Sequence, residues 1–240
     1  MTTTGRHIVS AFDDDLVTVQ AKISEMGGVV EELLAMALKS FKNRDADLAR
    51  EVIVKDKVLD DMEVGLEELA TQVIALRQPM AQDLRVLISA IKIASTLERI
   101  GDLAKNIARR AIYLSEAKPI KVSNSIIQMG KVTRRQLSDI LDAHARRDAD
   151  LAVDIWHRDA ELDEMYNAIF REVVTYMMED SRMIGLGSQL LFVAKNLERI
   201  GDHTTHISEM IYYVVKGEPL GDERPKGEPI AVGTDLGFED

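Results

Sequence analysis

One hexapeptide, Leu-Glu-Arg-Ile-Gly-Asp, occurs twice in the chain, at residues 97–102 and at residues 197–202. Two more segments repeat: Asp-Ala-Asp-Leu-Ala at 45–49 returns at 148–152, and Asp-x-x-Leu-Asp-x-Met at 56–62 returns at 159–165. These two pairs are offset by 103 residues and the hexapeptides by 100, so one loop differs by three residues between the copies. An internal duplication explains all three pairs, and we expect two halves with the same fold.

The apolar residues of both halves recur at helical spacing, with hardly any strand-like alternation. Residues 1–216 contain only two prolines, Pro79 and Pro119, which separate helices and halves. The predicted helices span residues 10–41, 45–77, 81–115, 122–146, 148–179 and 184–216, and Asp45 and Asp148 are natural N-caps. Because short loops make neighbouring helices antiparallel, we predict an all-α fold of two tandem three-helix bundles.

The predicted boundaries put the first bundle in residues 1–117 and the second in residues 118–216. Residues 217–240 carry three of the five prolines and several glycines and acids, which is typical of a flexible acidic tail.

Composition excludes several classes of function. The chain has 41 acidic against 30 basic residues, a net charge of −11, which argues against a nucleic-acid partner. It has no cysteine, so a disulfide framework, a thiolate zinc site and an iron–sulfur cluster are excluded. No secretory signal is visible, and the longest uncharged apolar stretch, 183–194, is short of the roughly 20 residues of a membrane helix. We therefore expect a cytoplasmic protein that does not insert into membranes.

Paired carboxylates are the clearest chemical feature. Glu98 and Asp102 lie one helical turn apart, about 40° apart around the axis, and they continue a face that carries Leu84, Ile88 and Ile91. Glu198 and Asp202 repeat this pair in the second half. The preceding helix of each half supplies a second pair, Asp56 with Asp60 and Asp159 with Asp163.

If the two helices of a half pack together, four carboxylates face one another and repel unless a cation lies between them. Oxygen ligands favour Mg²⁺, Mn²⁺, Zn²⁺ or iron. The alternative is that the acids are solvated or paired with neighbouring Arg or Lys. Arg85, Lys92 and Arg99 form a separate basic stripe, which could meet an acidic partner or phosphate but is more simply a solvated face.

Other site patterns are absent from the sequence. It has no glycine-rich phosphate loop, no Gly-x-Ser-x-Gly elbow and no Glu-x-x-His pair, so we expect no organic cofactor and no catalytic residues.

The two hexapeptides, about a hundred residues apart and accompanied by the Asp-x-x-Leu-Asp patterns, make the chain resemble the PhoU family over residues 10–216. The resemblance implies two three-helix bundles side by side. It also implies multinuclear iron or zinc bound at Glu98, Asp102, Glu198 and Asp202, with Asp56, Asp60, Asp159 and Asp163 beside them. Asn106 fits the family pattern four residues after the last Asp, whereas His206 departs from it in the second half.

The resemblance further implies a negative regulator of phosphate uptake and of the phosphate two-component system, without catalytic turnover. Its implied partners are a PhoR-like sensor histidine kinase, the PstB-like ATPase subunit of the Pst transporter and a second copy in a homodimer. A carboxylate-bridged metalloenzyme and a passive helical scaffold are the alternatives. The metalloenzyme would need an open coordination position and a substrate pocket, and oxygen-dependent turnover would support it. The scaffold would carry no stoichiometric metal.

Overall fold

The computed structural model describes residues 3–118 and 120–221, and every regular element within these ranges is helical. The all-α prediction is confirmed. In chain order the elements are α1 (Thr3–Asn43), α2 (Ala46–Lys55), α3 (Lys57–Arg77), α4 (Gln82–Ser115), α5 (Val122–Arg146), α6 (Ala149–Arg158), α7 (Ala160–Glu179), the 3₁₀ turn η1 (Ser181–Met183) and α8 (Ile184–Lys216). Residues 222–240 of the predicted tail lie outside the described residues.

The predicted helices 45–77 and 148–179 are each broken in two, at Asp56 and at Asp159. At both breaks the chain tightens into a turn, because the amide of Leu59 donates to the carbonyl of Asp56 (2.9 Å) and that of Leu162 to Asp159 (3.0 Å). Apolar periodicity continues across each break, so the sequence pattern alone predicted one helix. The break occurs at the same position of both copies and is part of the duplicated design.

The predicted N-caps are confirmed. The Asp45 carboxylate accepts a hydrogen bond from the amide of Leu48 (2.9 Å), and the Asp148 carboxylate accepts from the amide of Leu151 (2.9 Å). Each cap satisfies an amide that the first turn of a helix leaves without an intrahelical partner.

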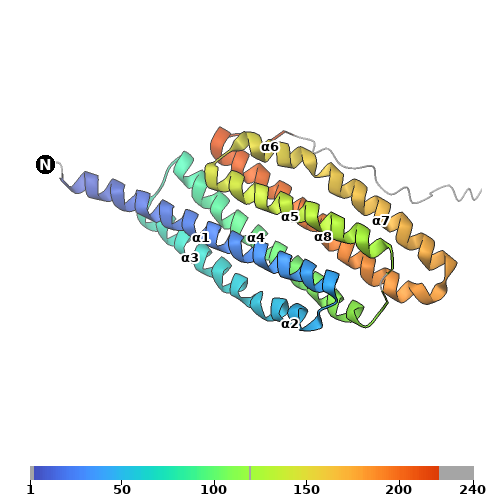
Figure 1. The fold of residues 1–240 in the computed structure, drawn as a ribbon. Coiled ribbons are helices and arrows are strands. Elements are labelled where there is room, and N and C mark those ends of the chain that lie inside the picture. Colours follow the sequence, from blue (N-terminus) through green and yellow to red (C-terminus); the bar gives the residue numbers. More distant parts are fainter. Residues whose placement is uncertain (1–2, 119, 222–240) are drawn as a thin grey trace, which may run out of the picture.

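Each half is a three-helix bundle in which the broken helix counts as one long element. In the first half α4 packs against α1, α2 and α3, and in the second α8 packs against α5, α6 and α7. The halves lie side by side, joined by α4 against α8 and by α1 against α5 (Figure 1). The predicted pair of tandem bundles is confirmed.

Helices α4 and α8 run antiparallel. Near the end of α4, Arg110 donates to Gln189 near the start of α8 (3.0 Å). Near the start of α4, the Arg85 guanidinium lies 5.9 Å from the ring centre of Tyr213, near the end of α8. The two hexapeptides are therefore beside each other in the middle of this helix pair.

Helices α1 and α5 meet through a reciprocal contact. A Cβ atom on Gly27 would lie 2.6 Å from Leu141 Cδ2, and one on Gly130 would lie 2.5 Å from Leu38 Cδ2. Gly27 and Gly130 are equivalent in the duplication, and so are Leu38 and Leu141. In each half a glycine contacts a leucine of the other half, so the halves are related by a pseudo-twofold axis.

The buried apolar residues form one cluster that runs through both halves, from Val19 in α1 to Ile211 in α8. Two residues of the face that Glu98 and Asp102 continue, Leu84 and Ile88, are exposed (37% and 39%). Within residues 3–118 and 120–221, none of the helices has the length and apolarity needed to cross a bilayer.

Candidate functional site

The first acidic cluster comprises Asp56, Asp60, Glu98 and Asp102. Asp56 occupies the break between α2 and α3, Asp60 follows one turn later, and α4 carries the other two. Burial, followed by the charges of Asp102, Glu63, Asp60 and Asp56, raises the pKa of Glu98 from 4.5 to about 7. The structure therefore brings the four predicted residues together and adds Glu63.

Lys105 lies between two of these carboxylates. Its ammonium donates to Asp56 Oδ2 at 2.5 Å and also to Asp102 Oδ1. The Asp56 side chain is only 4% exposed, and burial raises its pKa although the lysine opposes that rise. Burial works against the charge of Lys105 too, but the hydrogen bonds with Asp102 and Asp56 raise its pKa overall. The chain itself supplies the cation that facing carboxylates require.

The glycine of each hexapeptide lets the buried aspartate approach. A Cβ on Gly101 would overlap Leu59 Cδ1 and lie 3.3 Å from Asp56 Oδ1. A Cβ on Gly201 would lie 2.5 Å from Asp159 Oδ1 and 2.6 Å from Leu162 Cδ1. The two duplicated motifs therefore form one contact in each half: the Asp-x-x-Leu segment packs onto the glycine.

The second acidic cluster comprises Asp159, Asp163, Glu198 and Asp202. Asp159 is 1% exposed, and its Oδ1 accepts a hydrogen bond from Gln136 Nε2 at 3.1 Å. The same amide donates to Thr204 Oγ1 at 2.8 Å. A neutral amide from α5 thus stabilises the buried carboxylate of Asp159, whereas the Lys105 ammonium stabilises the equivalent carboxylate of Asp56 in the first half.

The surroundings of the Glu198 carboxylate differ from those of the Glu98 carboxylate. Its Oε1 accepts from the Lys195 ammonium at 2.6 Å, whereas its Oε2 is buried and has no hydrogen-bond partner. The Lys195 ammonium also lies 5.1 Å from the ring centre of Tyr166. His206, where the sequence departed from the family pattern, contacts Glu209 at 3.3 Å on an exposed surface.

Comparison of equivalent positions shows how the clusters diverged. Thr205 replaces Lys105, and Gln136 stands where the first half has Leu33. Lys195 stands where the first half has Ser95. A lysine thus pairs with two aspartates in the first half, Asp56 and Asp102, and with a glutamate, Glu198, in the second.

The donor set consists of carboxylate oxygens, which suit Mg²⁺, Mn²⁺, Zn²⁺ or iron. However, in residues 3–118 and 120–221 no three Asp, Glu or His side chains are grouped so as to hold a metal ion. In the first half the Lys105 ammonium already lies between Asp56 and Asp102. Metal binding at either cluster would require side chains to rearrange, and it stays a prediction.

Sequence reasoning identified the eight carboxylates and kept open their pairing with a neighbouring Arg or Lys, as Glu198 pairs with Lys195, but it did not name the lysines. Lys105 follows Asp102 by three residues and Lys195 precedes Glu198 by three, a spacing that places side chains on one helix face. A residue-by-residue comparison of the halves would have found both lysines. The same comparison finds Gln136 in place of Leu33, but it does not show that this amide contacts Asp159, because the two residues lie on different helices.

Comparison with known proteins matches both halves to one family. A family model described as "PhoU domain" matches residues 23–111 and again residues 126–211. A "Phosphate-specific transport system accessory protein PhoU homolog" from Caulobacter vibrioides is 47% identical over 92% of the chain and 96% of its own length. The Escherichia coli "Phosphate-specific transport system accessory protein PhoU" is 41% identical over 92% of the chain and 93% of its own length.

Solved structures agree with these matches. The crystal structure of PhoU from Pseudomonas aeruginosa superposes with a TM-score of 0.84 at 38% identity, covering 86% of this chain and all of that one. The phosphate transport system regulatory protein PhoU from Streptococcus pneumoniae gives a TM-score of 0.82 at 30% identity, covering 88% and 99%.

Proposed function

The chain belongs to the PhoU family, and from this membership we propose that it is a cytoplasmic accessory protein of phosphate transport that acts as a negative regulator. In this role it restrains phosphate uptake and keeps the phosphate two-component system off when phosphate is plentiful. The observation that carries the proposal is the match of both halves to proteins named as accessory to phosphate-specific transport, at 41–47% identity over most of the chain.

The proposed mechanism is regulation by contact with a PhoR-like sensor histidine kinase and a PstB-like ATPase subunit. The exposed arginines of the two hexapeptides, Arg99 and Arg199, support such a contact. Both are close enough to His203 on α8 that, after burial, their charges lower its pKa. Exposed apolar side chains of α8, Ile184 (51%) and Phe192 (52%), lie on the same helix as Arg199. Arginine and aromatic residues are enriched at protein interfaces.

The test is made in cells. Deletion of the gene, followed by assay of alkaline phosphatase in phosphate-rich medium, should switch this starvation reporter on. Complementation with the unchanged gene should switch it off, and complementation with Arg99→Ala/Arg199→Ala should leave it partly on if these arginines contact a partner. A reporter that stays silent after deletion, in a strain without a second gene of this family, would contradict the proposed role.

We propose metal binding as a separate property and assign it first to the second acidic cluster. Glu198 keeps a buried oxygen without a hydrogen-bond partner, and Thr205 stands where Lys105 fills the first cluster. Metal content of the protein after anaerobic purification should fall in Glu198→Gln/Asp202→Asn and be unchanged in Glu98→Gln/Asp102→Asn. The quadruple variant combines both pairs of substitutions. If its metal content equals that of the unchanged protein, Glu98, Asp102, Glu198 and Asp202 are not metal ligands.

Absence of stoichiometric metal would favour the passive helical scaffold, in which the acidic clusters bind no metal. Oxygen-dependent turnover would favour the carboxylate-bridged metalloenzyme. The proposed homodimer is tested on the same samples by light scattering, which gives the mass of the particle against 26.8 kDa for one chain.

A further inference from the structure

A cavity of about 290 Å³ lies at one end of the molecule, where the two halves meet. Its walls come from the end of α1, the segment that follows α4, the start of α5 and the start of α8. The lining residues are Phe41, Lys42, Arg44, Leu114, Lys118, Ile120, Lys121, Ser123, Asn124, Ile127, Leu186 and Leu190. This volume is close to the lower end of the range of about 300–1,000 Å³ for small-molecule pockets.

The charge of this cavity is opposite to that of the protein. Four of its lining residues are cationic and none of the described ones is acidic, although the whole chain carries −11. Lys42, Arg44, Lys118 and Lys121 take part in no ion pair within residues 3–118 and 120–221. Four cations without acidic partners repel one another and favour binding of an anion.

The start of α5 adds to the positive potential. Lys121, Ser123 and Asn124 line the cavity, and α5 has neither a side-chain N-cap nor an acidic residue in its first turn. The amides of Ser123 and Asn124 already donate to the carbonyls of Ile120 (3.1 Å) and Lys121 (2.9 Å), so this helix end contributes the partial positive charge of the helix dipole and not free donors. Apolar side chains from α1, α4, α5 and α8 form the rest of the wall and give room for an organic group.

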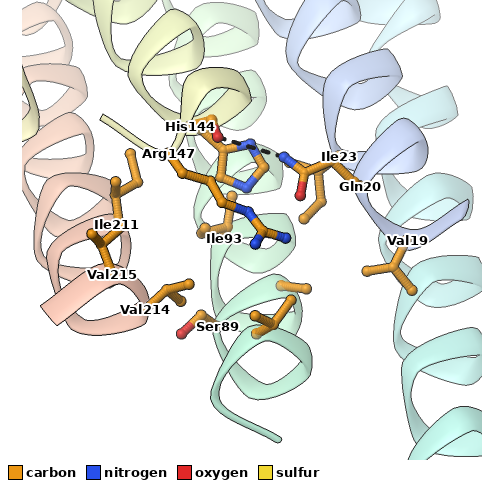
Figure 2. A pocket seen from close by; sticks show the side chains of 12 residues that line it. Val19, Gln20, Ile23, Ser89, Ile93, His144, Arg147, Ile211, Val214 and Val215 are labelled. Atoms are coloured by element: carbon orange, nitrogen blue, oxygen red, sulfur yellow. Dashed lines mark hydrogen bonds between the residues drawn. The ribbon is translucent and has the colours of Figure 1, made fainter. Parts of the chain in front are cut away.

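The duplication supplies an internal control for this cavity. At the opposite end of the molecule lies a much smaller cavity, of about 30 Å³, with room for about two water molecules. Figure 2 shows the side chains that line it. Its wall is mostly apolar, with Val19, Ile93 and Ile211 among its residues, and Gln20 donates to the carbonyl of His144 at 3.5 Å.

Only one of the four cations has a basic counterpart in this second cavity. Arg147 is equivalent to Arg44, and both have left-handed backbones at the turn between two helices (φ 52° and 59°). The positions equivalent to Lys42, Lys118 and Lys121 hold Ala145, Glu218 and Thr18. The helices at that end pack without lysine at these positions, and Lys42, Lys118 and Lys121 are exposed, so packing does not require the three lysines.

We infer that the cationic cavity binds a small phosphate-bearing anion, whose phosphoryl group contacts Lys42, Arg44, Lys118 and Lys121. An organic part, where the ligand has one, lies against the apolar wall of Leu114, Ile127 and Leu190. The inference goes beyond the proposed function and is independent of it, since it depends only on the cavity and its charge.

Isothermal titration calorimetry of the full chain at constant ionic strength tests this inference. The probes are inorganic phosphate, pyrophosphate and ATP, with chloride as the anion of the buffer. We expect at least one probe to bind with a Kd below 1 mM. ATP binding at least tenfold tighter than pyrophosphate would indicate an organic phosphate on the apolar wall, and the reverse order would indicate an inorganic one.

Matched charge variants decide where the probe binds. Lys42→Gln/Lys118→Gln/Lys121→Gln should weaken binding at least tenfold, because it removes three of the four phosphate contacts. Lys22→Gln/Lys57→Gln/Lys216→Gln makes the same change of charge at exposed lysines away from the cavity and should leave the Kd within twofold. Circular dichroism checks that both variants keep their helices.

Two results would overturn the inference. One is the absence of binding of all three probes below 1 mM, and the other is an equal loss of affinity in both triple variants, which would show an effect of net charge alone. Neither result bears on the reporter assay of the proposed function, so the two proposals fail separately.

Discussion

Asp56 and Asp159 are equivalent residues whose carboxylates are both almost completely buried, and different neighbours stabilise them. An ammonium from α4 donates to the first, and an amide from α5 donates to the second. A buried carboxylate needs such donors, because its desolvation costs several kcal/mol when it is left unpaired. The buried aspartate is thus common to both halves, whereas its donor comes from a different helix in each.

Replacing Lys105 by Met tests how strongly the first half depends on its cation. The change leaves Asp56 buried without an ionic partner, so we expect the free energy of unfolding at pH 7 to fall by about 3 kcal/mol. Urea denaturation measures the loss. Lys105→Met combined with Asp56→Asn should recover most of it, because no buried charge is left. A loss of less than about 0.5 kcal/mol in the single variant would mean that solvent already reaches Asp56.

The raised pKa of Glu98 predicts how stability changes with pH. Burial and the neighbouring acids raise the pKa from 4.5 to about 7, so between these values the folded chain binds a proton that the unfolded chain has released. The contribution of Glu98 to the free energy of unfolding is therefore largest below pH 4.5, and it is lost as the pH rises through 7. Glu98→Gln should stabilise the metal-free protein at pH 8 by about 1 kcal/mol and have little effect at pH 4.5, after allowance for solvent screening.

Urea denaturation of the unchanged protein and Glu98→Gln at both pH values, in the presence of a chelator, measures this difference. Glu198→Gln is the comparison, because Lys195 already pairs with Glu198 and the same gain is not expected. An equal effect of Glu98→Gln at both pH values would show that the residue does not titrate in this interval.

At the scale of the elements, the glycines of α1 and α5 set how closely the two halves approach. Gly27→Ala and Gly130→Ala would each place a methyl group within 2.6 Å of a leucine, and we expect a loss of about 1–3 kcal/mol for either. The two losses should be similar, because the contact is reciprocal. Gly28→Ala is the control: it has open space within 4 Å, so it should stabilise α1 by about 0.5–1 kcal/mol. Denaturant unfolding of the three variants gives all three values.

The same elements show how far sequence reasoning reached. Helical periodicity and the duplication correctly predicted α5 and α8 to the residue, and Asp45 and Asp148 as N-caps. The breaks at Asp56 and Asp159 were missed, because apolar spacing continues across them and only the buried carboxylate distinguishes these positions. The i, i+4 spacing placed Glu98 and Asp102 on one face, but it could not reveal that Lys105 lies between Asp102 and Asp56, since that depends on how α2 packs against α4.

At the scale of the whole molecule, the duplication leaves two equivalent ends that differ in charge. The end formed by the start of α4 and the end of α8 has a small apolar cavity, and the other end has a large cationic one. The helices pack alike at both ends, but α1 is helical from Thr3 whereas the equivalent α5 begins only at Val122, so the chain path as well as the side chains makes this difference. A duplicated fold can therefore keep one copy of a feature for packing while the other acquires a binding site.

The two bundles share their core, and this predicts that they unfold together. The buried apolar cluster runs without interruption from α1 to α8, and α4 packs along α8 between the halves. Separation of the halves would expose that interface to water, at a cost of roughly 25 cal/mol for each Å² of apolar surface. We therefore expect one calorimetric transition for the full chain, with a ratio of calorimetric to van't Hoff enthalpy near one.

Two variants sharpen this last measurement because they lie in different halves. Lys105→Met perturbs the first bundle and Gln136→Leu perturbs the second, by removing the amide that donates to Asp159. If the halves are one cooperative unit, either change lowers the Tm of the single transition without splitting it. If they are independent, each change shifts only one of two transitions, and residues 1–117 produced alone show cooperative unfolding. The second pattern would mean that the duplication still consists of two autonomous domains, and that the shared core adds contact without coupling.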